Sequence, residues 1–454
     1  MLLRFCVSNF LSFKECAEFS MIAEKENDKH IKHLKVINNI SKKKHLRILK
    51  GGFLFGANAS GKSNFIHAIK FARDIVLRGI SSVNLEKKYF RLDKESRNMP
   101  GVFQFDIYQN ERIYSYGFAI DYQKARFLQE WLYDQTEMEK CIFLRGIDEE
   151  EQSYCESELE FKDENEQQKF DVYRKAISQK KMNGILFLHD MYLHGDERDS
   201  AYVPFRDVIE WFQRLILIFP DSKYQPIYSY IKEDTQKNLV HYLGEFDTGI
   251  KDVQVVKKDI DSFDKFPMKI LGEIKQDIIH QVRKGKNSSE IVNGIIQANG
   301  ELFELESKDD NIFINQLGLN HGNSNDLFGF SDESDGTKRL VNLLPIFKKS
   351  NLNKIIIVDE IDRSLHTIAT TRLIREFYHW GIDAESQMIA TTQDSNILDL
   401  SLLRPDEIWF VERGQKMASS LYPLSLFKLR FDSNLERDYL IGRYGAIPIF
   451  TESK

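Results

Sequence analysis

The 454-residue sequence lacks the features that mark several large classes of protein. No run approaches the ~18 apolar residues of a transmembrane helix, so no membrane span is expected. The amino terminus reads as a strand and lacks the layout of a signal peptide. The four cysteines have neither zinc-binding nor redox spacing, which predicts reduced thiols in a cytoplasmic protein. No sustained heptad repeat is present, which excludes a long coiled-coil arm.

An excess of positive charge is also missing. The formal net charge is −6, so overall electrostatics do not favour nucleic acid as a ligand. A local basic groove is still compatible with this total. The apolar content of 42% is sufficient for a sizeable core.

What the sequence does contain is a complete phosphate-binding loop, Gly56–Ser63, which matches G-x-x-x-x-G-K-[ST] without a mismatch. Its glycines allow a tight turn that directs backbone N–H groups at a phosphate. Lys62 supplies a positive charge, and Ser63 supplies a hydroxyl for Mg²⁺. An apolar strand at 52–55 enters the loop and a helical pattern at 64–77 leaves it, so phosphate would lie at a helix amino terminus. The predicted nucleotide-binding residues are Gly56, Asn58, Ser60, Gly61, Lys62, Ser63 and Asn64.

A second motif is an apolar strand that ends in two acids. Ile355–Val358 is typical of a buried parallel strand, and Asp359 and Glu360 follow it directly. Asp359 is expected to hold Mg²⁺ together with Ser63, and Glu360 to orient and polarise an attacking water as the catalytic base. Two solvated acids after an ordinary strand would give the same pattern, but the phosphate loop upstream favours the catalytic interpretation.

Between these motifs lies a polar turn, Glu333–Arg339, followed by an apolar helical run from Leu340 to Phe347. A serine hydroxyl, a glycine and a helix amino terminus together can form a second phosphate cradle, which makes Ser334 and Gly336 candidates. The alternative is a Ser-Asp-Gly turn that only caps the helix. The flanking motifs favour the cradle.

Taken in this order, the motifs resemble those of ABC-type ATPases. They are most similar to the stand-alone bacterial ATPases related to RecF, the SMC proteins and the overcoming-lysogenisation-defect ATPases. Gly56–Asn64 and Glu333–Thr337 have this group's forms of the phosphate loop and the signature loop. Phe5–Phe13 resembles its opening strand and turn, and Gly442–Pro448 resembles its carboxyl-terminal end. The resemblance covers nearly the whole chain and is weaker between about residues 140 and 300.

This resemblance implies an ATP site that closes between two subunits of a homodimer or a higher homo-oligomer. Asp362, in the loop after the catalytic glutamate, would make a contact across that interface. The other residues that would meet there are Lys62, Ser63, Asp359 and Glu360 from one subunit and Ser334 and Gly336 from the other.

Gln393 departs from the resemblance, because ABC-type ATPases usually place a histidine at this point beside the γ-phosphate. The amide of Gln393 can still donate a hydrogen bond and is a candidate catalytic group, but it cannot take up charge. Gln104 and Gln129 are both candidates for the glutamine that senses Mg²⁺ in this class, and the sequence does not choose between them.

The predicted fold is α/β: an ABC-type P-loop ATPase core with an antiparallel β subdomain and a mainly helical insert. Residues 1–135 would hold the N-terminal half with the phosphate loop, 136–300 the helical lobe, and 301–454 the C-terminal half with the signature loop, the acidic strand end and the dimer loop. Alternating patterns predict antiparallel strands at Leu3–Val7, Val102–Ile107, Ile113–Ile120 and Arg126–Leu132. Helices are expected at Phe170–Ile177, Phe205–Leu217, Pro226–Leu243 and Pro267–Arg283.

Two functions fit these observations. The first is a cytoplasmic ATP-binding and Mg²⁺-dependent ATP-hydrolysing sensor or regulator. The resemblance implies a role in anti-phage, abortive-infection-like defence beside a separately encoded effector, commonly a nuclease. The alternative is a RecF-like clamp that binds duplex DNA in repair or maintenance, against which the acidic total argues. Strands expected at 407–411 and 419–422 occupy much of the chain after Thr392, so no nuclease domain of its own is expected.

Overall fold

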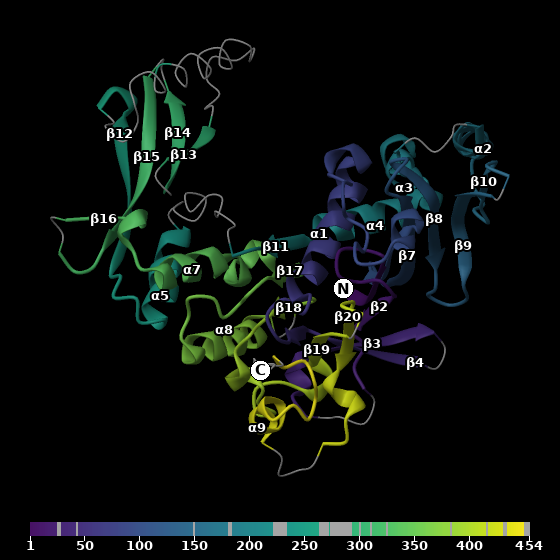
Figure 1. The fold of residues 1–454 in the computed structure, drawn as a ribbon. Coiled ribbons are helices and arrows are strands. Elements are labelled where there is room, and N and C mark those ends of the chain that lie inside the picture. The colour runs from purple at the N-terminus through teal and green to yellow at the C-terminus, as the bar shows by residue number, and fades with distance from the viewer. Residues whose placement is uncertain are drawn as a thin grey trace. The chain divides into compact units, whose positions relative to one another are not determined.

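The computed structural model (Figure 1) describes residues 1–24, 29–41, 44–148, 150–179, 184–220, 234–262, 272, 293–298, 301–308, 311–323, 326–381, 384–414, 416–429 and 434–448. The chain divides into two compact units. Unit 1 comprises Met1–Phe219, Phe347–Asp362 and Thr370–Lys454, and unit 2 comprises Pro220–Ile346 and Arg363–Ala369. None of the helices in these described ranges is both long and apolar enough to cross a membrane.

A six-stranded sheet forms the centre of unit 1. Its first five strands are parallel, and only the last, at the edge, is antiparallel. The central strands are buried along their whole length, which is why they consist of nearly continuous apolar residues rather than an alternating pattern. In sheet order the strands are β11 (Leu215–Ile218), β17 (Ile355–Val358), β18 (Gln387–Thr391), β5 (Gly51–Phe55), β19 (Ile408–Arg413) and β20 (Ser419–Pro423).

A seven-stranded antiparallel sheet is the second layer of unit 1. Buried and partly exposed residues alternate along β6, as expected for a sheet with one face on the core. The order is β10 (Ser153–Glu156), β9 (Lys140–Ile147), β8 (Arg126–Asp134), β7 (Arg112–Asp121), β6 (Gly101–Gln109), β1 (Leu2–Ser8) and β2 (Ala17–Ser20). A separate hairpin joins β3 (Leu34–Ser41) to β4 (Lys44–Leu49).

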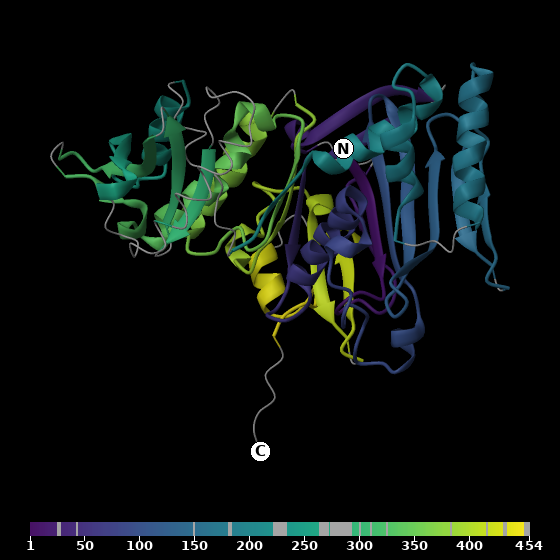
Figure 2. The same ribbon diagram turned by 90° about the horizontal axis from the view of Figure 1, so that it is seen from above.

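Helix α1 (Lys62–Arg78) joins the two sheets through one core (Figure 2). The ring of Phe65 lies 5.4 Å from that of Phe5 and 5.3 Å from that of Phe19, between ring centroids. Leu54 of β5 and Ile389 of β18 belong to the same buried cluster. This packing holds the helix that leaves the phosphate loop. The remaining α-helices described in unit 1 include α2 (Glu164–Gln179), α3 (Phe187–His194), α4 (Val203–Gln213) and α9 (Leu435–Leu440), while α8 (Thr367–Trp380) begins at the boundary with unit 2.

Unit 2 contains an antiparallel sheet of its own, visible in Figure 1. Its order is β12 (Asp252–Asp259), β15 (Asn311–Asn320), β14 (Glu301–Lys308) and β13 (Asn293–Ala298), with β16 (Phe328–Gly329) paired to β15. Two α-helices, α5 (Asp234–Glu245) and α7 (Asp335–Leu343), belong to the same unit.

The predicted α/β class and the strands predicted around the motifs are confirmed. In the described part of 136–300, strands β9 to β13 lie beside helices α2 to α5, and the extent of the predicted helical lobe stays a prediction. Leu215–Leu217, predicted as the end of a helix, belongs to β11, because these apolar residues pair with β17. Of the helix predicted at 226–243, α5 covers the part from 234, and the rest lies outside the described residues, as does nearly all of that predicted at 267–283.

The prediction of four reduced cysteines is wrong for two of them. Cys6 and Cys16 form a disulfide, with 6.1 Å between their Cα atoms. Cys6 lies on β1, and Cys16 directly precedes β2, so the antiparallel pairing of these strands brings the thiols together. Cys141 and Cys155 are free, and burial raises the pKa of these thiols to about 11 and about 12. Both therefore stay protonated at neutral pH.

Candidate nucleotide site

The phosphate loop runs from the end of β5 to the start of α1, as predicted. Gly61 has a φ of 115°, and a Cβ there would lie 2.3 Å from Ser419 Oγ and 2.7 Å from Ser12 Oγ. A Cβ on Gly56 would lie 2.3 Å from the carbonyl oxygen of Val411. Both positions therefore require glycine, one for its backbone angle and both for space.

Lys62 is buried and bonded to its own loop. Its side chain donates to the carbonyl oxygens of Gly56, at 2.7 Å, and Ala57, at 3.0 Å. Burial lowers the pKa of Lys62, and the nearby carboxylates of Asp362, Asp359 and Glu360 oppose this shift. A phosphate bound at the helix amino terminus would compete with the two carbonyls for the ammonium donors.

The acids at the end of β17 lie beside the phosphate loop. The Ser63 hydroxyl donates to Asp359 Oδ1 at 3.1 Å, and the Thr391 hydroxyl donates to the same oxygen at 2.6 Å. The Thr391 oxygen also accepts the Glu360 backbone N–H at 2.8 Å. Three elements that are distant in sequence, α1, β17 and β18, thus meet in one hydrogen-bond network at the carboxyl ends of the parallel strands.

Glu360 begins a tight turn after β17. Its φ is 51°, in the left-handed region, and the next N–H, that of Ile361, donates to the carbonyl of Thr391 at 3.0 Å. The left-handed backbone is uncommon for a residue other than glycine, and such conformations gather at functional sites. The turn holds the half-buried Glu360 side chain at the strand end.

Asp362 and Gln393 lie together within one chain. Asp362 Oδ2 accepts the Gln393 backbone N–H at 3.3 Å, while its buried Oδ1 has no hydrogen-bond partner in the described part of the chain. An unpaired buried carboxylate oxygen is costly, and a ligand or ordered water at the site would satisfy it. The predicted cross-subunit role of Asp362 stays a prediction.

The other predicted loop residues are placed around the same turn. Asn58 lines two adjoining hollows of about 490 and 420 Å³. The Ser60 carbonyl accepts a hydrogen bond from the Ser419 hydroxyl, and Asn64 donates to Ser12 Oγ at 2.8 Å. The structure therefore gathers Gly56–Asn64, Asp359–Asp362 and Gln393 in unit 1.

The signature loop belongs to unit 2, where Ser334 caps α7. The Ser334 hydroxyl oxygen accepts the Thr337 backbone N–H at 3.1 Å. A Cβ on Gly336 would lie 3.0 Å from the carbonyl oxygen of Ser364. This local geometry fits both a helix cap and a phosphate cradle, so the role of Ser334 and Gly336 across a subunit interface stays a prediction.

Sequence reasoning missed three contributors to the site. Thr391 connects Asp359 to Glu360, Ser419 bonds the phosphate loop, and the carbonyl of Ala446 accepts the Ala57 N–H at 2.8 Å. Thr391 had a usable signal, since it is a polar residue at the end of a buried strand. Ser419 and Ala446 had none, because both reach the loop only through folding.

Neither glutamine proposed as a Mg²⁺ sensor is distinguished by its surroundings. Gln104 lies on β6 of the antiparallel sheet and donates to Asp106 and Ser115. Gln129 lies on β8 of the same sheet.

The residues at the network suit Mg²⁺. A serine hydroxyl and a carboxylate are hard oxygen ligands, and Mg²⁺ is usually held by one or two carboxylates together with substrate phosphates and water. No cluster of three or more His, Cys, Asp or Glu with metal-binding geometry occurs in the described ranges. Ser63 and Asp359 would hold Mg²⁺.

Comparison with known proteins places this chain in a family. No functionally curated protein matches the chain significantly. Among solved structures, an SMC head bound to the C-winged helix domain of ScpA is similar over 93% of this chain and 97% of its own, with 14% identity and a TM-score of 0.36. The SMC head domain from Thermotoga maritima is similar over 94% and 99%, with 12% identity and a TM-score of 0.32. At these TM-scores and identities, the similarity does not support any conclusion about this chain.

The family comparison is decisive by contrast. A family model described as "AAA domain, putative AbiEii toxin, Type IV TA system" matches residues 53–399, well over half of the chain. The match begins in β5 and includes the phosphate loop, the signature loop and the acidic strand end. The chain therefore belongs to this AAA-domain family of P-loop ATPases.

Proposed function

We propose that this protein binds ATP with Mg²⁺ and hydrolyses it at the network of Ser63, Asp359, Thr391 and Glu360. The observation that carries the proposal is the meeting of Asp359 with both Ser63 and Thr391 through hydrogen bonds at the carboxyl ends of the strands. In open α/β sheets, ligands bind at this edge.

Each residue has a distinct task in this proposal. Lys62 leaves the carbonyls of its own loop and neutralises the β- and γ-phosphates. Ser63 and Asp359 would hold Mg²⁺, which would supply charge stabilisation for the phosphoryl group. Glu360 orients and polarises the attacking water, and Gln393 donates an amide hydrogen bond beside the γ-phosphate.

The site would be completed by a second copy of the chain. Ser334 and Gly336 of that copy would present the amino terminus of α7 to the γ-phosphate, and Asp362 would make a contact across the interface. ATP would then hold two copies together, and hydrolysis would release them.

The biological setting we propose is abortive-infection-like defence, in which ATP-driven closure controls a separate effector protein, a nuclease. Two points support this: the resemblance of the motifs to defence ATPases, and the family description, which names an AbiEii toxin of a type IV toxin–antitoxin system.

A capture experiment tests both the composite ATP site and the effector partner. Glu360→Gln protein with ATP is purified from the native host, and its partners are identified by mass spectrometry and a nucleic-acid stain. Dimeric protein with bound ATP and a stoichiometric protein partner is expected. Bound duplex DNA without a protein partner would replace the effector proposal with a RecF-like clamp, and a monomer with ATP bound would contradict the composite site.

A further inference from the structure

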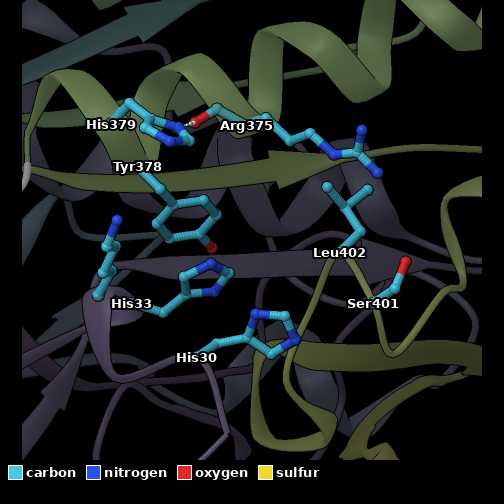
Figure 3. Close-up of a pocket in the computed structure, with 8 residues that line it drawn as sticks. His30, His33, Arg375, Tyr378, His379, Ser401 and Leu402 are labelled. Atoms are coloured by element: carbon cyan, nitrogen blue, oxygen red, sulfur yellow. Dashed lines mark hydrogen bonds between the residues drawn. The ribbon is translucent and has the colours of Figure 1, made fainter.

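A cavity of about 240 Å³ lies near the amino ends of the strands in the six-stranded sheet (Figure 3). The phosphate loop lies at the opposite, carboxyl ends of these strands. Tyr378, which lines the cavity, shows where the cavity lies relative to β5. Its hydroxyl is next to Gly51, the first residue of β5, where a Cβ would be 1.9 Å from the hydroxyl oxygen. The phosphate loop follows the last residue of the same strand. A strand of this length spans about 16 Å, so the cavity is separate from the ATP site.

The floor of the cavity is a buried and well-ordered group of side chains. The His33 ring stacks on Tyr378 with 3.4 Å between ring centroids and 3° between their planes. His33 Nδ1 lies 2.9 Å from Glu407 Oε2, and the Tyr378 hydroxyl donates to Glu407 Oε1 at 2.8 Å. Glu407 also accepts the backbone N–H of Arg404 at 2.8 Å.

These contacts determine how His33 can act. A ring nitrogen that faces a carboxylate carries the hydrogen, so Nδ1 donates to Glu407. The second nitrogen, Nε2, has no hydrogen-bond partner within the described residues, although the side chain is only 7% exposed. A polar atom of a buried side chain that lines a cavity is a contact point for a ligand.

The walls and rim combine two histidines with two cationic side chains. His30 and His379 line the cavity, and each is held through one ring nitrogen, by the Leu400 and Arg375 carbonyls at 2.8 and 2.9 Å. Lys32 and Arg375 line it as well, and neither forms an ion pair with a carboxylate of the described ranges. Figure 3 labels His30, Arg375 and His379 among the side chains that line this cavity.

None of the carboxylates that the structure describes lines the cavity itself. Glu407 lies beneath it and is already bonded to three donors, and the Ser401 hydroxyl at the rim donates to Asp399, which is not a lining residue. Among the described lining residues the ligand therefore meets two cations, Lys32 and Arg375, which favours an anion. The volume is below the ~300 to 1,000 Å³ that drug-sized ligands occupy, so the ligand is small.

We propose that this cavity binds the phosphate group of a small anionic ligand, either free inorganic phosphate or a phosphomonoester. Lys32 and Arg375 would supply charge-assisted hydrogen bonds to its oxygens, and His33 Nε2 would accept a hydrogen bond from a phosphate O–H at the floor. The inference does not depend on ATP hydrolysis, because the residues and the strand edge are different.

Calorimetric titration of the full chain tests the proposal. All proteins carry Lys62→Ala, so that the phosphate loop does not bind the probe. The parent is titrated with inorganic phosphate and, separately, with AMP; the tighter probe identifies a free oxyanion or a phosphomonoester as the ligand. Lys32→Gln with Arg375→Gln should weaken binding about a hundredfold or more, since two charge-assisted hydrogen bonds to the phosphate are lost.

A matched control removes two other charges. Arg91→Gln with Lys94→Gln changes exposed side chains that do not line the cavity, and binding should stay within twofold of the parent. His33→Gln is the second probe and should weaken binding while thermal unfolding shows a folded protein. Equal affinity in the Lys32 and Arg375 variant, an equal loss in the control, or no binding of either probe by the parent would overturn the proposal.

Discussion

In the six-stranded sheet, the residues at the carboxyl ends of the strands differ in chemistry from those at the amino ends. We call these the first and the second edge. At the carboxyl ends, Asp359 accepts from two hydroxyls and Asp362 keeps one buried oxygen without a partner in the described ranges. At the amino ends, Glu407 accepts from His33, Tyr378 and a backbone N–H. At the first edge, the carboxylates of Asp359 and Asp362 could bind a cation. At the second edge, the Glu407 carboxylate already accepts three hydrogen bonds and lies beneath cationic side chains.

The difference shows how one sheet can present acidic side chains at one end of its strands and basic side chains at the other. Loops after the parallel strands carry the acids, and in the proposed function Mg²⁺ and a nucleotide would complete their bonding. Segments before the strands carry the histidines and basic residues, whose supporting carboxylate is internal. We therefore expect changes at the first edge to alter catalysis and changes at the second to alter stability or anion binding.

Lys62→Ala should have the largest effect. Loss of the ammonium removes the charge that faces the β- and γ-phosphates, so ATP hydrolysis should fall about 10²-fold or more. Steady-state ATPase assays measure this, and thermal unfolding checks the fold. Hydrolysis within a few-fold of the parent would remove Lys62 from the site.

Glu360→Gln should separate chemistry from binding. The amide keeps the size of the side chain but cannot act as a base, so turnover should fall about 10²-fold with ATP still bound. Glu197→Gln, at an exposed glutamate of the same unit, is the matched control and should keep parental turnover. Parental turnover in Glu360→Gln would show that the base assignment is wrong.

Thr391→Val tests the residue that connects the two acids. The change removes one donor to Asp359 and the acceptor of the Glu360 N–H, which should cost about 1–3 kcal/mol of unfolding free energy and lower turnover about tenfold. Denaturant unfolding and ATPase assays measure the two effects. A loss of stability with no loss of turnover would limit Thr391 to a structural role.

Tyr378→Phe makes the corresponding change at the opposite edge. Buried Glu407 loses one donor, so the free energy of unfolding should fall by about 1–3 kcal/mol, while turnover of the folded enzyme should stay near the parental value. Burial and the nearby Glu407 raise the pKa of Tyr378, which keeps its hydroxyl a donor at neutral pH. A tenfold loss of turnover would show that the two edges are coupled.

Gln393→His should have the smallest effect. The glutamine amide already donates a hydrogen bond, and histidine adds the ability to take up charge, so turnover should change by less than about tenfold. Unchanged turnover would show that position 393 does not limit the rate. A much larger gain in turnover would show that Gln393 limits the rate of ATP hydrolysis at this site.

The local motifs were predictable because each depends on short-range rules. The phosphate loop needs glycines between a strand and a helix, and β17 is apolar because both its faces are buried. The alternation along β6 likewise reports one buried face. These features were read from neighbouring residues and are confirmed by the fold.

Features that depend on distant partners were not predictable. Leu215–Leu217 fits a helix or a strand until β17 pairs beside it, and Cys6 and Cys16 show no recognisable spacing until β1 and β2 pair. The cavity of His33, Tyr378 and Glu407 also brings together segments that are hundreds of residues apart.

The sequence by itself therefore determined the α/β class, the phosphate loop and the acidic strand end, because spacing along the chain specifies them. Only the tertiary structure decided that Thr391 would connect Asp359 to Glu360 and that a basic cavity would form at the other edge. Hydrogen bonds between distant segments depend on strand order and register, and these are set by the packing of the whole core.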